Sequence, residues 1–302
     1  MSNSQVYHTS VLLHECVEQL NIIPEGIYLD ATFGGGGHSR EILKKLGPKG
    51  KLMVFDQDED ARQNLPDDDR IIFIQENFRY AARFVRLYKL PTLNGVLADL
   101  GVSSFQFDTA ERGFSTRFDA VLDMRMDQRT NFSALDVLNK YAEHKLIRIF
   151  EEYGEVTNAK ALAKRVVEVR GAMKLNTVNE LKQAIQGLIY GNPNKYLAQV
   201  FQALRIEVND ELGALKDFLE SITASLSADG RLCLITFHSL EDRIVKQWMK
   251  SGKFEETSLD FVLPSKPSLL KVLHKKPILP SEDELKQNPR SRSAKLRVGV
   301  KK

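Results

Sequence analysis

Cysteine and tryptophan are scarce in this chain of 302 residues, which has two cysteines and one tryptophan. Cys16 and Cys233 fall on a predicted helix and in a predicted strand, so they support neither a disulfide framework nor a thiolate metal cluster. We expect both to be buried as small hydrophobic residues. No apolar run approaches the length that spans a membrane, and the N-terminal residues lack a signal-peptide pattern. These absences predict a cytoplasmic protein that has no membrane partner.

Positive and negative side chains nearly balance, with a formal net charge of +3, but they are unevenly distributed along the chain. Residues 264–302 contain 11 Lys and Arg against 3 Asp and Glu, which gives +8, whereas residues 1–263 carry −5. In residues 288–297 arginines alternate with serines, a pattern that suits phosphate contacts and salt-dependent binding to nucleic acid. The basic C-terminal segment therefore predicts a nucleic-acid partner, with a merely solubilising tail as the alternative.

Four consecutive glycines, residues 34–37, stand where a strand should lead into a helix. Residues 27–29 read as a buried strand, and residues 38–46 carry apolar side chains at helical spacing. Glycine permits positive φ and lets a ligand approach the backbone, while the following helix offers free N–H groups at its start. We predict that a ligand binds this turn at the carboxyl edge of an open α/β sheet. A glycine turn without a ligand is the alternative.

The dinucleotide fingerprint G-x-G-x-x-G does not fit the turn, because its sixth position falls on Ser39 or Arg40. NAD is therefore disfavoured, and S-adenosylmethionine is the predicted cofactor. Two rival functions stay open at this point. An NAD-dependent oxidoreductase would leave the basic C-terminal segment unexplained, and a non-catalytic RNA-binding assembly factor would leave the glycine turn unexplained.

Polar and aromatic side chains follow the next three predicted strands, residues 51–55, 70–74 and 95–98. Asp56, with Asp58 close behind it, stands where an acidic residue usually meets a ribose. Phe78 could lie against adenine, although a place in the core is equally compatible with its position. Asp99 ends the fourth strand and brings another carboxylate to the carboxyl edge of the sheet.

The alternation of strands and helices stops after residue 104, and residues 107–191 show helical periodicity only. We predict an α/β fold of the Rossmann-like class I methyltransferases with an inserted all-helical domain. The predicted division is a first part of the methyltransferase domain at 1–106, the insertion at 107–195 and a second part at 196–302. The expected later elements are helices over 134–150, 159–171, 178–189 and 196–224, a strand over 231–237, strand and loop over 254–280, and an edge strand over 295–300.

Eight segments in order closely resemble the bacterial cytosine-N4 methyltransferases of small-subunit ribosomal RNA, the RsmH or MraW family. The resemblance spans nearly the whole chain. It rests on residues 8–13 (HTSVLL), 30–39 (DATFGGGGHS), 99–104 (DLGVSS), 110–115 (AERGFS), 122–127 (LDMRMD), 201–206 (FQALRI), 237–246 (FHSLEDRIVK) and 288–293 (NPRSRS).

The resemblance implies S-adenosylmethionine-dependent N4-methylation of a decoding-region cytidine in 16S ribosomal RNA of the assembled small subunit. It also implies a set of cofactor-binding residues. Gly36, Gly37 and His38 would meet the amino-acid part of the cofactor, Asp56 the ribose and Phe78 the adenine, while Asp99 and Gln106 would line the same pocket. Asp99 is the candidate catalytic residue, as the hydrogen-bond acceptor for the cytosine amine. Its alternative role is to hold the cofactor only.

Other polar residues keep two interpretations each. His38 is expected to orient the cofactor or cap the turn rather than to act as a general base, and His238 could face the substrate or make a structural hydrogen bond. The acids and arginines of residues 123–129 could contact substrate or form structural salt bridges. No spacing of His, Cys and carboxylates predicts a metal site. A monomer and a homodimer are both compatible with the sequence.

Overall fold

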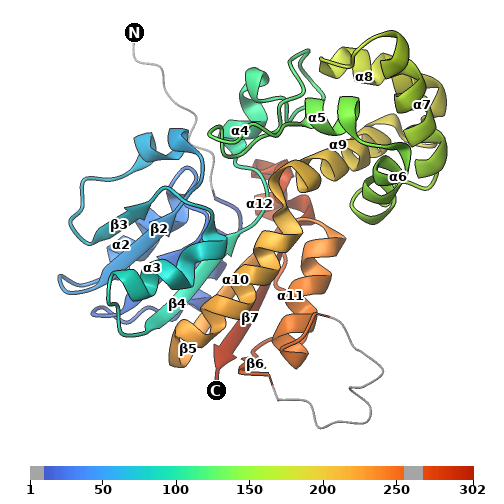
Figure 1. The fold of residues 1–302 in the computed structure, drawn as a ribbon. Coiled ribbons are helices and arrows are strands. Elements are labelled where there is room, and N and C mark those ends of the chain that lie inside the picture. Colours follow the sequence, from blue (N-terminus) through green and yellow to red (C-terminus); the bar gives the residue numbers. More distant parts are fainter. Residues whose placement is uncertain (1–9, 255–267) are drawn as a thin grey trace. The chain divides into compact units, whose positions relative to one another are not determined.

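The computed structural model describes residues 10–254 and 268–302. The chain divides into two compact units, which are described separately (Figure 1). The sheet unit comprises Met1–Gly101 and Leu212–Lys302, and the helical unit comprises Val102–Glu211. The domain boundaries expected from the sequence, at residues 106 and 195, remain a prediction about independently folding parts, which limited proteolysis would test.

The sheet unit is built on one sheet that has seven strands among the described residues, in the order β3-β2-β1-β4-β5-β7-β6. Strands β1 to β5 run parallel, and β7 is antiparallel to both of its neighbours. This doubly wound arrangement confirms the predicted Rossmann-like fold class. The strands are β1 (Ile27–Asp30), β2 (Lys51–Phe55), β3 (Ile71–Ile74), β4 (Leu93–Asp99), β5 (Leu226–Thr236), β6 (Leu270–Val272) and β7 (Lys295–Lys301).

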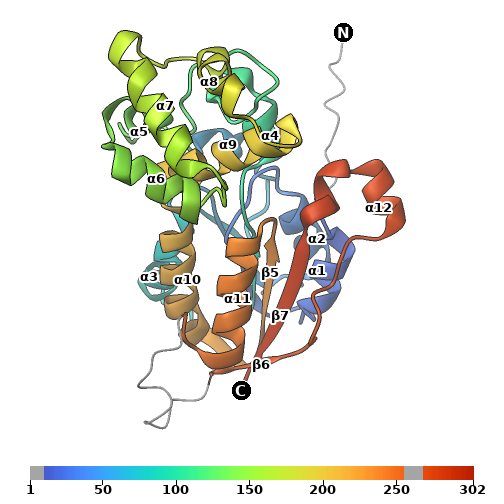
Figure 2. The same cartoon turned by 90° about the vertical axis from the view of Figure 1, so that its right-hand side faces the viewer.

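Helices cover both faces of this sheet, as Figure 2 shows with α10 and α11 on one side and α1 and α2 on the other. Side chains alternate between the faces along each strand. Met53 and Phe55 of β2 join the cluster formed with α3, α10 and α11, whereas Leu52 and Val54 join the cluster formed with α1 and α2. The helices are α1 (Leu13–Gln19), α2 (Gly37–Lys45), α3 (Ala81–Leu87), α10 (Glu211–Ser225), α11 (Ser239–Ser251) and α12 (Glu282–Gln287).

The register of the parallel strands brings their carboxyl ends to one edge. Asp30 lies beside Val54 and Leu97, and Asp99 lies beside Ile235. The loops after β1, β2, β4 and β5 therefore leave the sheet at neighbouring positions. This edge is where an open α/β sheet binds its ligands.

The helical unit has its own buried core of aliphatic and aromatic side chains. Its helices are α4 (Ser104–Asp108), α5 (Ala134–Lys140), α6 (Glu143–Glu152), α7 (Ala159–Ala172), α8 (Val178–Ile185) and α9 (Pro193–Asn209). Short 3-10 turns also occur at Ala110–Arg112 and Gln186–Leu188. Among the described residues of this unit, strand-like pairing occurs as an isolated antiparallel bridge between Val121 and Thr177. A helical insertion after the fourth strand, as the sequence predicted, accounts for this unit.

Three predicted elements were wrong in detail. The single helix expected over 134–150 is two helices, because the chain at Tyr141 is extended. The helix expected over 196–224 is broken at Asp210, whose left-handed backbone (φ 46°) ends α9 before α10 begins. Strand β7 is not an edge strand, because β6 pairs with its outer side. Of the segment expected as strand and loop, residues 255–267 lie outside the described residues.

Both cysteines are free and buried, as predicted. The described residues include no helix that is long and apolar enough to cross a membrane.

Candidate active site

The glycine turn after β1 adopts the backbone that only glycine takes at no cost. Gly34 has φ 51° and Gly36, which precedes the first turn of α2, has φ 73°. Side chains hold two carbonyl oxygens of the turn. The carbonyl oxygen of Gly34 accepts a hydrogen bond from Asn64 Nδ2 at 3.0 Å, and that of Gly35 accepts one from the Arg40 guanidinium. A Cβ placed on Gly35 would meet no atom within 4 Å. The turn is thus rigid and has open space beside Gly35, as a ligand approaching the backbone requires.

The first turn of α2 packs against the N-terminal segment of the chain. A Cβ on Gly37 would lie 2.1 Å from Oγ of Ser10, so the side chain of Ser10 would have to move to admit any larger residue there. His38 is buried, and its Nε2 lies 3.0 Å from the carbonyl oxygen of Val11. Leu12 has a left-handed backbone (φ 50°), and its N–H donates to Glu284 Oε1 at 2.8 Å. Sequence patterns gave no signal for this role of residues 10–12, because the contact joins two segments that local periodicity does not relate.

Asp56 ends β2 and uses both carboxylate oxygens to fix the neighbouring turns. Oδ2 accepts a hydrogen bond from the N–H of Gly34 at 2.7 Å, and Oδ1 accepts one from the N–H of Asp58 at 2.9 Å. Burial raises the pKa of Asp56 to about 7, against the lowering effect of these two hydrogen bonds. A carboxylate has about four lone-pair positions, so each oxygen can still accept a hydroxyl hydrogen from a ligand.

Asp30 is a buried member of the site that sequence reasoning did not single out. Its Oδ2 accepts a hydrogen bond from the Ser39 hydroxyl at 2.7 Å, and its Oδ1 accepts one from the N–H of Thr32 at 3.2 Å. The Thr32 hydroxyl oxygen in turn accepts from the N–H of Asp99 at 2.6 Å. Burial raises the pKa of Asp30 to about 6. These bonds connect the ends of β1 and β4 to the start of α2.

Asp99 is the most exceptional side chain at this edge. Its Oδ1 is buried and has no hydrogen-bond partner among the described residues, and its Oδ2 lies 4.0 Å from Nδ1 of His38. Burial, together with the negative charges of Asp30, Glu241 and Glu284, raises the pKa of Asp99 well above its ordinary value. A buried acceptor without a donor costs free energy unless a ligand supplies the donor.

The two remaining predicted cofactor residues lie in different units. Phe78, in the 3-10 turn after β3, is half-buried and packs edge-to-face against Phe218 of α10, with ring centroids 5.2 Å apart. Gln106 is a buried residue of α4 in the helical unit, where it forms a capping box with Ser103. Its contact with the cofactor stays a prediction.

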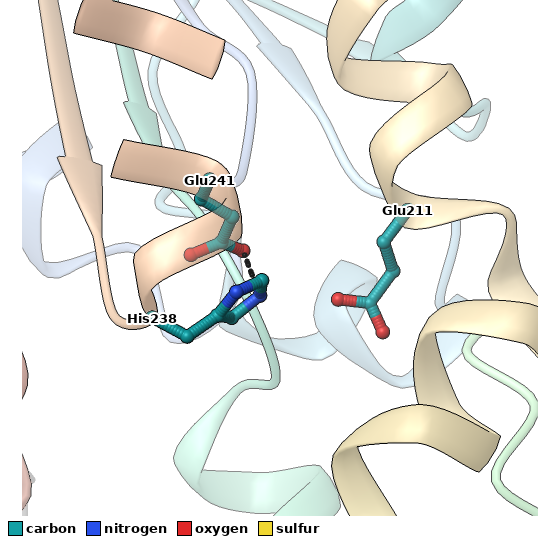
Figure 3. Close-up of side chains that lie close together, drawn as sticks. All are labelled: Glu211, His238 and Glu241. Atoms are coloured by element: carbon teal, nitrogen blue, oxygen red, sulfur yellow. Dashed lines mark ion pairs between the residues drawn. The ribbon is translucent and has the colours of Figure 1, made fainter. Parts of the chain in front are cut away.

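His238 and Glu241 lie together where β5 leads into α11 (Figure 3). Nε2 of His238 is 3.1 Å from Oε1 of Glu241, although the angles do not form a hydrogen bond. Oε2 of Glu241 accepts from the N–H of Phe237 at 2.9 Å. Glu211, the third residue drawn in Figure 3, binds the guanidinium of Arg205 with both oxygens, at 2.7 and 2.9 Å.

Comparison with known proteins identifies the family. The model of the MraW methylase family matches residues 5–302. The chain belongs to the MraW methylase family. Proteins named "Ribosomal RNA small subunit methyltransferase H" are similar over their full lengths: that of Flavobacterium johnsoniae is 50% identical, with 100% of both chains covered, and that of Bacteroides fragilis (strain YCH46) is 49% identical, with 98% of both covered.

Membership of this methylase family confirms that the chain is a methyltransferase and that S-adenosylmethionine is its cofactor. The geometry fits that group, because the glycine turn leaves space at Gly35 and Asp56 offers carboxylate oxygens at the adjacent strand end. The rival prediction of an NAD-dependent oxidoreductase is excluded by the family. Which residues contact the cofactor is a matter for the proposal that follows.

Proposed function

We propose that this methyltransferase methylates the N4 amine of a decoding-region cytidine in 16S ribosomal RNA of the small ribosomal subunit. The observation that carries the chemical part is the buried, unpartnered Oδ1 of Asp99 at the carboxyl end of β4. The shared name of the similar proteins supports small-subunit ribosomal RNA as the substrate. The cytidine and its N4 atom come from the family resemblance.

The bound cofactor supplies an electrophilic methyl group on a sulfonium. The residues of the chain must align the acceptor, because the lone pair of the cytosine amine is delocalised into the ring and makes it a weak nucleophile. Alignment alone lowers such barriers by several kcal/mol. We assign cofactor contacts to Gly36, Gly37, His38, Asp56 and Phe78 of the sheet unit, and to Gln106 of the helical unit.

Asp99 accepts the amine hydrogen in this proposal. The amine becomes acidic as its bond to the methyl carbon forms, and Oδ1 of Asp99 then takes the proton. Burial raises the pKa of Asp99 in the free protein, and a positive charge held beside it by the bound cofactor would favour the ionised carboxyl. Asp99 thus becomes a base only when the cofactor is present.

Exposed basic side chains of the C-terminal segment fit RNA phosphates. Lys275, Lys276 and Arg292 are exposed. Other basic residues of the same segment are structural instead: Arg297 pairs with Asp242, with Nε 2.6 Å from Oδ1, and is only 10% exposed. We therefore expect RNA affinity to depend on Lys275, Lys276 and Arg292. Replacing them should reduce the salt dependence of binding.

The test is methyl transfer from labelled cofactor to purified small subunits and to protein-free 16S RNA, followed by nucleoside mass analysis and mapping of the methylated position. N4-methylcytidine at one decoding-region site supports the proposal. A methyl group on another base or atom contradicts it. Binding of the subunit without any methyl transfer would favour the assembly-factor alternative.

Asp99→Asn tests the acceptor. We expect turnover to fall by about 10²–10⁴-fold, the usual contribution of a general base, while cofactor affinity is retained. Loss of cofactor binding with unchanged turnover at saturation would show that Asp99 only holds the cofactor. A ribosomal substrate would place the reaction in the cytoplasm.

A further inference from the structure

His38 carries a fixed pattern of donor and acceptor on its ring. Nε2 faces the carbonyl oxygen of Val11 at 3.0 Å, and a carbonyl only accepts, so Nε2 bears the hydrogen. Burial lowers the pKa of His38 to about 4, so the ring is neutral near pH 7. In a neutral imidazole the other nitrogen has a free lone pair. Nδ1 of His38 is therefore an acceptor.

The proposed base lies close to that acceptor. Nδ1 lies 4.0 Å from Oδ2 of Asp99, about 1 Å longer than a hydrogen bond. An ionised Asp99 has only acceptors and gains nothing from Nδ1. A protonated Asp99 can donate to Nδ1 from Oδ2 after a small movement, and hydrogen bonds in active sites often tighten when ligands bind.

We propose that His38 is a positioning residue for Asp99, whose protonated carboxyl donates a hydrogen bond to Nδ1 of His38. This inference rests on the proposed role of Asp99 as the acceptor of the amine proton. Oδ2 faces His38 at 4.0 Å, which leaves Oδ1, the oxygen without a partner, to accept from the substrate amine in this proposal.

The proton balance requires no charge on the imidazole. The amine nitrogen forms its bond to the methyl carbon, the carbon–sulfur bond breaks, and its electron pair stays on sulfur. One amine proton passes to Oδ1 of the ionised Asp99, which becomes neutral. Rotation of the carboxyl group then exchanges the positions of its two oxygens, and the hydrogen is accepted by Nδ1 of His38. The products are a neutral sulfide, a neutral methylated base and a neutral acid.

The groups that set the charge around Asp99 are Asp30 on β1, Glu241 on α11 and Glu284 on α12, all of which disfavour a second negative charge. Burial raises the pKa of the Cys16 thiol on α1, and the negative charge of Asp99 adds to this effect. His38 is thus the nearby group that offers a lone pair rather than a negative charge to the carboxyl hydrogen.

Two variants separate the two nitrogens of the ring. His38→Gln places an amide near Nε2 and can keep the hydrogen bond to Val11, but it removes the acceptor at Nδ1. His38→Asn places an amide oxygen near Nδ1 and gives up the contact with Val11. Loss of the acceptor weakens the protonated form of Asp99 and lowers its pKa.

We expect His38→Gln to lower kcat about tenfold or more, below the full effect of a general base, and to move the acid limb of the kcat/KM profile to lower pH. His38→Asn should keep the wild-type limb. Both variants remove the imidazole from the cofactor contact assigned to His38, so their cofactor affinities, measured by calorimetry, should be similar to each other, and kcat is compared at saturating cofactor. An unchanged limb in His38→Gln, or an affinity loss that accounts for the whole effect, would overturn the inference.

Nitrogen NMR of the cofactor-free wild-type protein gives a test that needs neither activity nor a variant. It should show a hydrogen on Nε2 of His38 and none on Nδ1, and the reverse tautomer would overturn the inference. Asp99→Asn is assayed in parallel. If it keeps full turnover, the proposed function of Asp99 fails; if it loses turnover while His38→Gln behaves as wild type, only the role of His38 fails.

Discussion

Aspartates have opposite environments in the two units. In the sheet unit, none of Asp30, Asp56 and Asp99 pairs with a Lys or Arg among the residues described, and neighbouring acids add to the effect of burial on the pKa of Asp56 and of Asp99. Burial raises the pKa of each of them. In the helical unit, Asp123 and Asp127 each bind an arginine two residues later through two hydrogen bonds.

In the helical unit, pairing with arginine determines the direction in which the pKa of each aspartate shifts. Partial burial acts to raise the pKa of Asp123, but hydrogen bonds from Arg125 outweigh it and lower that pKa; Arg129 does the same for Asp127. Of the two roles expected for these residues, the structure shows the salt bridges. A desolvated acid without a cation costs folding free energy, whereas an acid held by an arginine costs little. The two units therefore differ in whether a cation compensates their acids.

Asp56→Asn should have the largest effect on cofactor binding. The substitution removes the charge and one acceptor oxygen, so the affinity for S-adenosylmethionine should fall about tenfold to hundredfold, as for lost hydrogen bonds to a charged group. Calorimetry measures this. Asp127→Asn is the matched control from the helical unit and should leave affinity unchanged. Equal cofactor affinities in the two variants would contradict the contrast drawn between the acids of the two units.

Cofactor affinity should also depend on pH. If ribose hydroxyls donate to the ionised carboxyl of Asp56, as proposed, cofactor binding below pH 7 releases a proton, because the pKa of Asp56 is raised to about 7 in the free protein. Affinity should therefore decrease by up to about tenfold for each pH unit below that value. The cofactor-free protein has the opposite dependence: it loses stability as pH rises from about 4 to about 7, because the unfolded-state pKa is about 3.9. A pH-independent affinity would contradict the assignment.

Gly35→Ala should weaken cofactor binding severalfold at little cost in stability. A Cβ there meets nothing within 4 Å in the free protein, so its effect arises only when a ligand approaches the turn. Gly36→Ala is the contrasting variant: its φ of 73° and a Cβ 2.8 Å from the Phe33 ring should destabilise the fold, by about 1–2 kcal/mol for the left-handed backbone alone. Wild-type affinity in Gly35→Ala would show that the space beside Gly35 is not used.

Arg125→Gln should affect the stability of the helical unit and not the cofactor. Arg125 also donates to the carbonyl oxygens of Thr130, at 2.5 Å, and Gln128, at 3.3 Å. We expect a loss of about 1–2 kcal/mol in urea unfolding, the range for a partly buried charged group with several hydrogen bonds. A changed cofactor affinity with unchanged stability would reverse the roles assigned to the units.

Arg129→Gln should have the smallest effect. The side chain of Arg129 is 48% exposed, and exposed pairs contribute about 0–1 kcal/mol. Urea unfolding should therefore distinguish it from Arg125→Gln, and a loss as large as that of Arg125→Gln would show that exposure does not rank these pairs.

Local patterns predicted the parts of the fold that depend on neighbouring residues. The apolar run 51–55 coincides with β2, and the alternating run 295–300 coincides with β7 to within one residue, since both patterns are typical of strands in a sheet. Patterns failed where a single backbone conformation intervenes. The break at Asp210 is invisible to periodicity, because α9 and α10 both carry apolar residues at helical spacing.

The sequence by itself determined the sheet, the glycine turn and the acids that end β2 and β4, because strand, turn and helix signals are local and the carboxyl ends of parallel strands meet at one edge. Tertiary structure alone decided the states of those acids. The pKa values of Asp56 and Asp99 depend on burial by segments distant in the chain. The tautomer of the His38 ring depends on the carbonyl oxygen of Val11, 27 residues away. Desolvation and hydrogen bonding act through space, so spacing along the chain cannot specify them.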